Sequence, residues 1–208
     1  MSQSQPNLAS QSSKDIVLAN PAPLGLMGFG ITTVLLNFAN ANQYTSLAPV
    51  LSMGIFYGGI AQIIAGIMEF RKGNTFGTLA FLSYGLFWET FAGIFLIPGM
   101  GGFFTGAADA NNALGFYLFF WGVFTFLMWI GTLRLNGALM VVFGTLWILF
   151  FLLAIGKWEN ISSTSTLAIG TGYEGVLCGL TAVYTSIAQV LNEVYGKTVL
   201  PLWPRQKT

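Results

Sequence analysis

The stretch "ALMVVFGTLWILFFLLAI" (Ala138–Ile155) decides the class of this protein. It holds 18 residues without one charged side chain, close to the roughly 20 apolar residues that a helix needs to cross a bilayer. A membrane β-strand would instead alternate apolar and polar residues over about ten positions, which this stretch does not do. The stretch therefore predicts a transmembrane helix.

The composition of the whole chain agrees with this class. Of its 208 residues, 54% are hydrophobic and 7% are charged, whereas soluble domains are about one-quarter charged. A net charge of +1 makes nucleic acid an unsuitable partner. The absence of histidine and the single Cys178, which lies in an apolar run, leave no zinc-type or disulfide framework. We therefore predict no metal, no cofactor and no enzymatic activity.

Five further apolar runs predict an all-α integral membrane protein with six transmembrane helices. The predicted spans are Leu24–Ala41, Leu47–Phe70, Phe76–Pro98, Leu114–Leu133, Ala138–Ile155 and Thr166–Tyr195. Lysine and arginine in short loops set the orientation of such a protein. With the N-terminus inside, Lys157 is the one cationic residue on the outer side. Both termini are thus predicted to be cytoplasmic, in a multi-pass protein of the plasma membrane (the inner membrane of a Gram-negative cell).

The predicted organisation is one membrane domain between two short tails. Residues 1–19 form a polar N-terminal tail without the apolar core of a signal peptide. Residues 20–196 form the six-helix domain, and residues 197–208 form a cytoplasmic C-terminal tail. Small residues recur every three or four positions in the second and sixth spans. Such faces allow close helix packing, either within one protomer or between protomers or along a narrow pore.

Several polar residues lie within the predicted spans. Glu89, in "YGLFWETFAG", is costly in a membrane unless it is protonated, paired or hydrated. It is either a protonated acid bonded to a neighbouring helix or a group that carries a proton during transport. Glu174 is expected near the outer mouth, and Glu69, beside Arg71, is expected as a solvated or locally paired anchor. The candidate polar path or proton residues are Asn37, Gln62, Glu89, Thr90 and Glu174.

The heptapeptide "NPAPLGL" (Asn20–Leu26) precedes the first span. Proline lacks an N–H and disfavours helical backbone at the residue before it. Asn20 and Ala22 are therefore predicted to be extended, with the helix starting near Pro23. The Asn20 side chain can simply cap this helix, or the free N–H groups of the helix start can hold a carboxylate at the cytoplasmic mouth.

Five ordered motifs carry a resemblance to a known family. They are "NPAPLGLMGFG" (Asn20–Gly30), "GIFYGGIAQIIAG" (Gly54–Gly66), "GNTFGTLAFLSYGLFW" (Gly73–Trp88), "GVFTFLMWIGTL" (Gly122–Leu133) and "CGLTAVY…AQVLNEVYGKTVLP" (Cys178–Pro201). With these, the sequence closely resembles the acetate uptake transporter family, including its bacterial acetate–succinate permeases. The resemblance implies a six-helix protomer, a hexameric ring, and a path for acetate, similar small carboxylates and sometimes succinate through each protomer.

The resemblance also implies roles for particular residues. A hydrophobic constriction would be formed by Phe29, Tyr84 and Leu146, and Ala182 would be a small residue that influences substrate size. Glu89 lies outside the shared pattern, so the resemblance gives it no role. The signature residues expected at the cytoplasmic mouth are Asn20, Pro21, Pro23 and Gly25.

The predicted function is transport of acetate and similar small mono- and dicarboxylates, by proton symport or by channel-like permeation. The predicted partners are these carboxylates, protons, the lipid bilayer and further copies of the chain in a homo-hexamer. Three alternatives remain at this point: a channel for another small neutral or weakly charged solute such as ammonia, a membrane-embedded enzyme, and a structural or receptor-like membrane protein.

Overall fold

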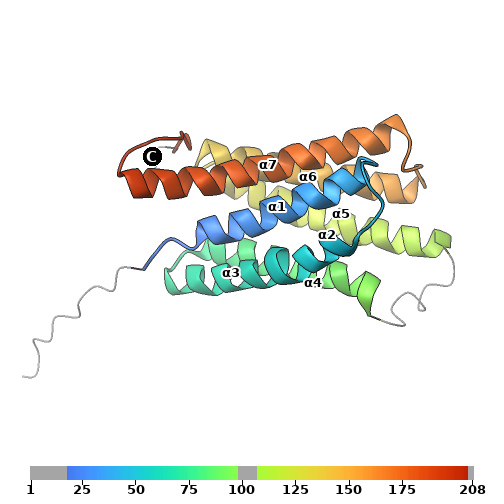
Figure 1. The fold of residues 1–208 in the computed structure, drawn as a ribbon, viewed down its shortest axis with the longest axis horizontal. Coiled ribbons are helices and arrows are strands. Elements are labelled where there is room, and N and C mark those ends of the chain that lie inside the picture. The colour runs from blue at the N-terminus through green and yellow to red at the C-terminus, as the bar shows by residue number, and fades with distance from the viewer. Residues whose placement is uncertain (1–17, 98–106, 206–208) are drawn as a thin grey trace, which may run out of the picture.

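A computed structural model describes residues 18–97 and 107–205, with the backbone alone at 107 and 108. The elements are α1 (Ala22–Asn40), α2 (Ala48–Met53), η1 (Gly54–Ala61), α3 (Gln62–Arg71), α4 (Thr75–Leu96), α5 (Ala107–Thr132), α6 (Gly137–Trp158) and α7 (Thr166–Tyr195). They make six helical spans that are long and apolar enough to cross a membrane, with α2, η1 and α3 counted as one (Figure 1). The predicted all-α architecture of six spans is confirmed.

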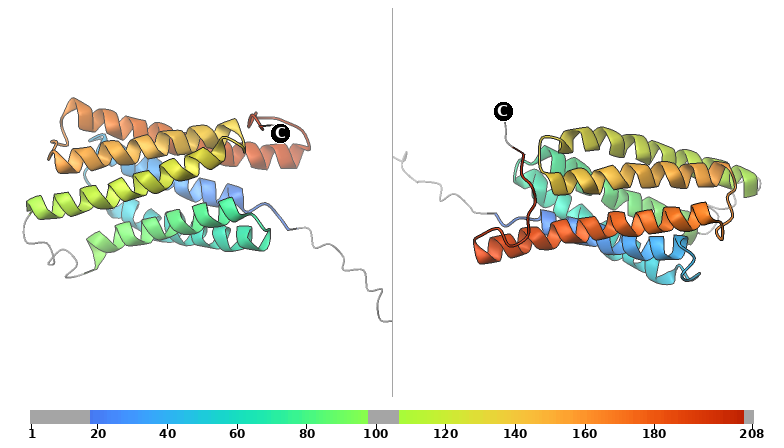
Figure 2. Two further views of the ribbon diagram at one scale, coloured as in Figure 1. Left: turned by 180° about the vertical axis from the view of Figure 1, so that it is seen from behind. Right: turned by 90° about the horizontal axis from the view of Figure 1, so that it is seen from above.

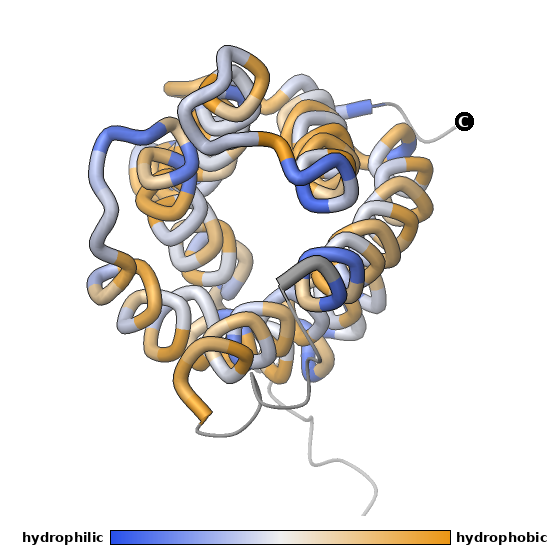
Figure 3. The backbone as a smooth tube through the Cα atoms, turned by 90° about the vertical axis from the view of Figure 1, so that its right-hand side faces the viewer, coloured by the Kyte–Doolittle hydropathy of each residue, from blue (hydrophilic) through white to orange (hydrophobic). Residues whose placement is uncertain are grey.

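The long helices run side by side along one axis (Figures 1 and 2). Viewed along that axis they are arranged as a ring (Figure 3), and buried aromatic and aliphatic side chains pack inside it. The start of α1 and the end of α7 lie at the same end of the bundle (Figure 1). The cationic residues Arg71, Lys72 and Arg134 flank helix ends at this end, so the positive-inside rule assigns it to the cytoplasm.

The second span contains a π-helical segment that the sequence analysis did not predict. Its glycines leave room for Trp88, because a Cβ at Gly54 or Gly58 would come within 3.3 or 3.0 Å of the Trp88 ring. π-Turns inside α-helices are rare and occur often at functional sites. Here the π-turns of η1 bring this span against α4 and α1.

Helix α1 is held between η1 and α7 by close backbone approach. A Cβ on Gly28 would lie 2.5 Å from the carbonyl oxygen of Tyr57, and one on Gly30 would lie 2.8 Å from that of Gly179. Only glycine fits where two helix backbones approach this closely. Phe29 lies between these two contacts, so both neighbouring helices fix the direction of its side chain.

The fourth span starts earlier than predicted. The sequence analysis placed its start at Leu114, whereas α5 begins at Ala107. Polar residues end an apolar run but do not end a helix, and here they find partners. Asn111 Nδ2 donates to Asn160 Oδ1 at 2.7 Å, and Trp158 Nε1 donates to the Asn112 carbonyl at 3.3 Å. Pro98, the predicted end of the third span, lies outside the described residues.

A strap after α7 runs back over the cytoplasmic ends of the helices. It turns at Gly196, whose φ of 62° is left-handed and suits glycine. The carbonyls of Leu202 and Trp203 accept hydrogen bonds from Ala138 N (3.2 Å) and Gly137 N (2.8 Å), at the start of α6. The strap thereby satisfies backbone donors that a helix start otherwise leaves free.

Candidate transport path

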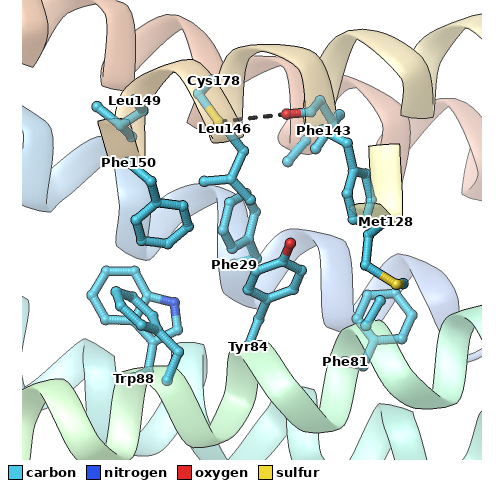
Figure 4. Close-up of a cluster of buried hydrophobic side chains, with 14 of the residues drawn as sticks. Phe29, Phe81, Tyr84, Trp88, Met128, Phe143, Leu146, Leu149, Phe150 and Cys178 are labelled. Carbon is cyan, nitrogen blue, oxygen red and sulfur yellow. Dashed lines mark hydrogen bonds between the residues drawn. The ribbon is translucent and has the colours of Figure 1, made fainter. Parts of the chain in front are cut away.

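Phe29, Tyr84 and Leu146 come together in the middle of the bundle, from α1, α4 and α6 (Figure 4). They are 6%, 3% and 3% exposed. The rings of Phe29 and Tyr84 are 5.9 Å apart between centroids, and they are tilted by 47°. The structure therefore brings together the three residues for which the family resemblance implied a constriction.

The polar end of Tyr84 is bonded to α5. Its hydroxyl donates to Thr125 Oγ1 on α5 at 2.9 Å, and Thr125 in turn donates to the Trp121 carbonyl at 2.7 Å. A buried tyrosine hydroxyl needs such a partner. The hydroxyl of Tyr84 is thus occupied by α5, and its ring packs beside Phe29.

A cavity of about 280 Å³ lies on the cytoplasmic side of the constriction. Its wall includes Phe29, Tyr84 and Leu146 at one end and the charged residues Glu69 and Lys72 at the other. Its remaining polar lining residues are Asn20, Gln62, Asn74, Asn136 and Gln189. The inner approach to the constriction is therefore polar and carries both signs of charge.

The signature heptapeptide borders this inner cavity through Asn20. Asn20 Oδ1 accepts from Ala22 N at 3.3 Å and from Lys72 Nζ at 3.2 Å, and its Nδ2 donates to Gln189 Oε1 at 2.8 Å. The expectation that Ala22 is extended was wrong, because α1 already begins there. Pro21 itself adopts helical backbone and its carbonyl accepts from Leu24 N. The Asn20 side chain thus both supports the helix start and contacts a cation at the mouth.

Two other signature residues, Pro23 and Gly25, act on the inner cavity through their neighbours. The carbonyl of Pro23 accepts a hydrogen bond from Ser186 Oγ at 2.7 Å, which ties α1 to α7. Gly25 faces Phe81, and a Cβ there would lie 2.5 Å from that ring. Phe81 is itself part of the cavity wall. Gly25 therefore makes room for a lining residue rather than lining the cavity.

Glu69 is the functional candidate that the sequence analysis missed. It was expected as a solvated or locally paired anchor, but it is 0% exposed and belongs to the wall of the inner cavity. Its Oε2 accepts from Asn74 Nδ2 at 2.7 Å, while its buried Oε1 has no hydrogen-bond partner among the described residues. Asn74 caps α4 through Gly77 N at 3.1 Å. The cap fixes Asn74, and Asn74 fixes Glu69 in the cavity wall.

A second cavity, of about 220 Å³, lies beyond the constriction on the outer side. Phe29 and Leu146 line both cavities, so these two residues separate them. Most of the outer wall is apolar or aromatic. Its polar and charged lining residues are Thr33, Asn37, Trp88, Asn40 and Lys157.

Of the remaining candidates, two line a cavity and four do not. Gln62 lines the inner cavity and Asn37 the outer one, both 1% exposed. Glu89 packs between α4 and η1, where a Cβ on Gly59 would lie 2.2 Å from its Oε1. The remaining three candidates are Thr90, Glu174 and Ala182. Among the described residues, neither cavity wall includes these three or Glu89.

Thr90 bonds to Tyr117 at 2.8 Å, Glu174 holds both carboxyl oxygens buried, and Ala182 is 0% exposed in the core. The described residues also contain no group of three or more His, Cys, Asp or Glu side chains placed to hold a metal ion. The two cavities are thus lined by neutral polar groups and apolar side chains, with Glu69 and Lys72 in the inner wall and Lys157 in the outer one.

Comparison with known proteins identifies the family. Residues 2–204 match the GPR1/FUN34/yaaH family. The chain belongs to this family. Its relatives in the GPR1/FUN34/yaaH family include the "Succinate-acetate/proton symporter SatP" of Escherichia coli (strain K12), 52% identical over 89% of this chain and 95% of the relative. A yeast relative, "Ammonia transport outward protein 2" of Saccharomyces cerevisiae, is 38% identical over 83% of this chain and 61% of its own length.

A solved structure matches the fold of this chain. It is described as "Structure of the bacterial acetate channel SatP" and superposes with a TM-score of 0.82. The identity is 49%, and the match covers 89% of this chain and 99% of the other. The six-span fold described above is therefore the fold of that channel.

Proposed function

We propose that the protein moves acetate and similar small carboxylates across the plasma membrane, through a path inside each chain. The observation that carries this proposal is the pair of cavities that reach the same apolar constriction from opposite sides. Membership of a family of transporters and channels supports it, and supports a role other than catalysis. The E. coli relative is named for succinate as well as acetate, so both are substrates to assay. The ammonia alternative is not favoured, since the 52% identical relative and the matching structure are both named for acetate.

The constriction selects by size and by hydration. A hydrophobic ring excludes water and lets through what can shed its hydration there. A carboxylate with a small methyl group presents an apolar end that fits against Phe29 and Leu146. Polar groups on either side replace the water that its charged end loses. A bulky or strongly hydrated solute lacks both advantages.

Counterflow of labelled acetate in proteoliposomes tests this function. Vesicles with the purified protein and unlabelled acetate inside should accumulate label from outside transiently, and protein-free vesicles should not. A lack of exchange for acetate, succinate and every other small carboxylate tried would contradict the proposal.

The position of Glu69 makes it the better candidate for a proton step than Glu89. Glu69 lines the inner cavity, together with the cation Lys72, whereas Glu89 lies between α4 and η1. Glu69→Gln keeps an acceptor for Asn74 but replaces the carboxyl group with an amide that cannot carry a proton. We expect it to slow acetate uptake driven by a pH gradient while acetate exchange, which needs no net proton movement, persists. Glu89→Gln is the matched control and should behave as the parent. Slow pH-driven uptake in Glu89→Gln, with normal uptake in Glu69→Gln, would return the proton role to Glu89.

We propose that the protein assembles as a homo-hexamer, as the family resemblance implies. Glu89 supports assembly, because it is only half-buried in a single chain. Its Oε1 is buried against Gly59, but any part of an acidic side chain left facing lipid is costly, and a neighbouring protomer would cover that part. Native mass spectrometry from mild detergent should show a hexamer as the main species. A spectrum of monomers alone, from protein that is active after reconstitution, would contradict this.

A further inference from the structure

The strap after α7 carries positive charge and follows a fixed course. It folds back from the end of α7 to the start of α6 (Figure 1). Its described residues contain Lys197 and Arg205 but no aspartate or glutamate. Asn192 on α7 holds it, because Asn192 Oδ1 accepts from Val199 N at 2.6 Å and Asn192 Nδ2 donates to the Leu200 carbonyl at 2.8 Å. The positions of its charged side chains are therefore set by the fold.

Backbone pairing brings Arg205 beside the turn that joins α5 to α6. Arg205 N donates to the Leu135 carbonyl at 3.0 Å, and Asn136 and Pro204 form an antiparallel bridge. Arg134 directly precedes Leu135 on this turn. Two exposed arginines from distant parts of the chain thus lie at the same edge of the bundle.

The Arg205 side chain extends along the first turn of α6, toward the bilayer. Its Nη2 lies 3.6 Å from Met140 Sδ, and Met140 is in the first turn of α6. Because α6 has 22 residues and a span needs about 20, this turn lies at the boundary between hydrocarbon and headgroups. A thioether is a weak acceptor, whereas a guanidinium carries five N–H donors. Among the described residues the Arg205 guanidinium has no further partner, so it reaches headgroup depth with most of its donors unused.

Trp203 lies on the strap at the level of the start of α6. Its carbonyl accepts from Gly137 N at 2.8 Å, while its side chain is 56% exposed. The indole is stacked on Tyr184, with 6.2 Å between ring centroids. Its φ of 50° is left-handed, which is unusual for a bulky residue. Tryptophan is enriched where a membrane meets water, and an exposed indole held at this level fits the inner interface.

Negative charge from the protein is sparse around the two arginines. Of the acidic residues that the structure describes at the cytoplasmic end, Glu69 is buried in the wall of the inner cavity. The other, Glu193, lies in the last turn of α7, more than two helical turns (about 13 Å) beyond Tyr184. The cytoplasmic leaflet, by contrast, carries anionic lipids. The membrane is therefore the nearest source of a counter-ion for Arg205.

We propose that Arg134, Arg205 and Trp203 form a binding site for the headgroup of an anionic phospholipid in the cytoplasmic leaflet. The lipid phosphate pairs with Arg205 on the strap and with Arg134 on the turn, and it fastens together the two segments that the backbone bonds join. Trp203 packs against the glycerol and the upper acyl chains. Arginine suits this role because its planar fork binds phosphate through two parallel hydrogen bonds. None of the three residues lines either cavity, so the site is separate from the transport path and independent of the solute carried.

Native mass spectrometry of the whole protein tests the site. The protein is released from micelles that contain equal amounts of phosphatidylglycerol, which is anionic, and phosphatidylcholine. The parent should retain phosphatidylglycerol in preference. Arg134→Gln and Arg205→Gln should each weaken its binding about fivefold, as expected for one cation near an anionic membrane surface. The double variant should lose the preference. Trp203→Gly, which suits the left-handed backbone, should weaken the binding of both lipids and keep the preference.

Thermal unfolding in detergent gives a second measurement. Phosphatidylglycerol should raise the unfolding temperature of the parent, since a ligand that binds only the folded state stabilises it. It should not raise that of the Arg134→Gln/Arg205→Gln double variant. Inorganic phosphate, compared with chloride at equal ionic strength, should neither displace the lipid nor raise the unfolding temperature. Displacement by inorganic phosphate would overturn the lipid site and indicate a site for a soluble anion.

Lys197→Gln is the matched control. It removes the same charge from the same strap, but Lys197 follows Gly196 at the turn beyond the end of α7, on the side away from the bilayer. It should retain phosphatidylglycerol as the parent does. A loss of preference in Lys197→Gln as large as that in Arg205→Gln would indicate general surface charge and overturn the site. So would a double variant that retains phosphatidylglycerol like the parent.

Discussion

Replacing Leu146 with tryptophan is expected to abolish acetate passage in a protein that still folds and inserts. Leu146 is 3% exposed, lines both cavities, and faces Phe29 and Tyr84 (Figure 4). An indole at this position would fill the space between the two cavities that Leu146 lines. Overpacking of this kind costs about 1–3 kcal/mol of folding free energy, and the adjoining cavities give the ring room to relax. Transport should fall to the level of protein-free vesicles.

The opposite change should widen the path. Leu146→Ala removes side-chain volume from a close-packed site, so the ratio of lactate to acetate flux should rise. Ile148→Trp is the matched control, since Ile148 is 38% exposed two residues along the same helix. It should transport acetate as the parent does. Labelled-solute flux in proteoliposomes measures all three variants. An unchanged lactate-to-acetate ratio in Leu146→Ala, or acetate flux in Leu146→Trp, would remove Leu146 from the constriction.

Replacing Gly179 with valine should prevent the native packing of α1 against α7. A Cβ at Gly179 would lie 2.7 Å from the Gly30 carbonyl oxygen and 2.9 Å from Val34 N. Backbone atoms cannot move aside as a flexible side chain can, so the helices must separate. We expect a loss of more than about 4 kcal/mol of stability, which is exceptional for a single substitution. Gly170→Ala is the control, because nothing lies within 4 Å of a Cβ there.

Thermal unfolding in detergent, followed by the loss of monodisperse protein, checks this prediction. Gly170→Ala should unfold at the parental temperature, and Gly179→Val should aggregate or yield no folded protein at all. A Gly179→Val variant that unfolds within a few degrees of the parent would show that α1 and α7 tolerate a wider separation. Because α1 carries Phe29, any folded Gly179→Val protein should also have altered solute selectivity.

The six spans could be predicted because length and apolarity act locally. An uncharged apolar run such as Ala138–Ile155 is long enough to cross the bilayer as a helix, and this can be read without knowing its neighbours in the fold. The π-turns of η1 and the early start of α5 could not be predicted in this way. The first depends on Trp88 from another helix, and the second on hydrogen bonds to Trp158 and Asn160 at the end of α6. Such contacts join residues far apart in the sequence, and no local pattern reports them.

The residues of the candidate site also differ in how far the sequence could predict them. Phe29, Tyr84 and Leu146 were found through family motifs, which carry information on three-dimensional neighbours that one sequence lacks. Glu89 attracted attention because an acid in an apolar span is costly, but its helix face decides whether it meets the path. The side of α4 that bears Glu89 packs on Gly59 instead.

The charged residues at the two ends of the path carried weaker signals. Glu69 was taken for an interface residue because a cation follows it closely in the sequence. "EFRKGN" does contain a usable signal, since Asn74 is a good helix cap and stands five residues after this acid. Lys157 stood out in the sequence as the one cation on the outer side, but only the folded chain places it in a cavity wall.

The strap after α7 has a consequence for biogenesis. Residues 199–205 leave the ribosome after all six spans, yet their carbonyls complete the start of α6 beside Asn136 and Leu139, two lining residues of the inner cavity. Insertion into the bilayer and completion of the cytoplasmic mouth are therefore separate events, in that order. A newly made chain can therefore be integrated while its mouth is still unfinished, and the start of α6 gains its backbone partners only when residues 202–205 dock.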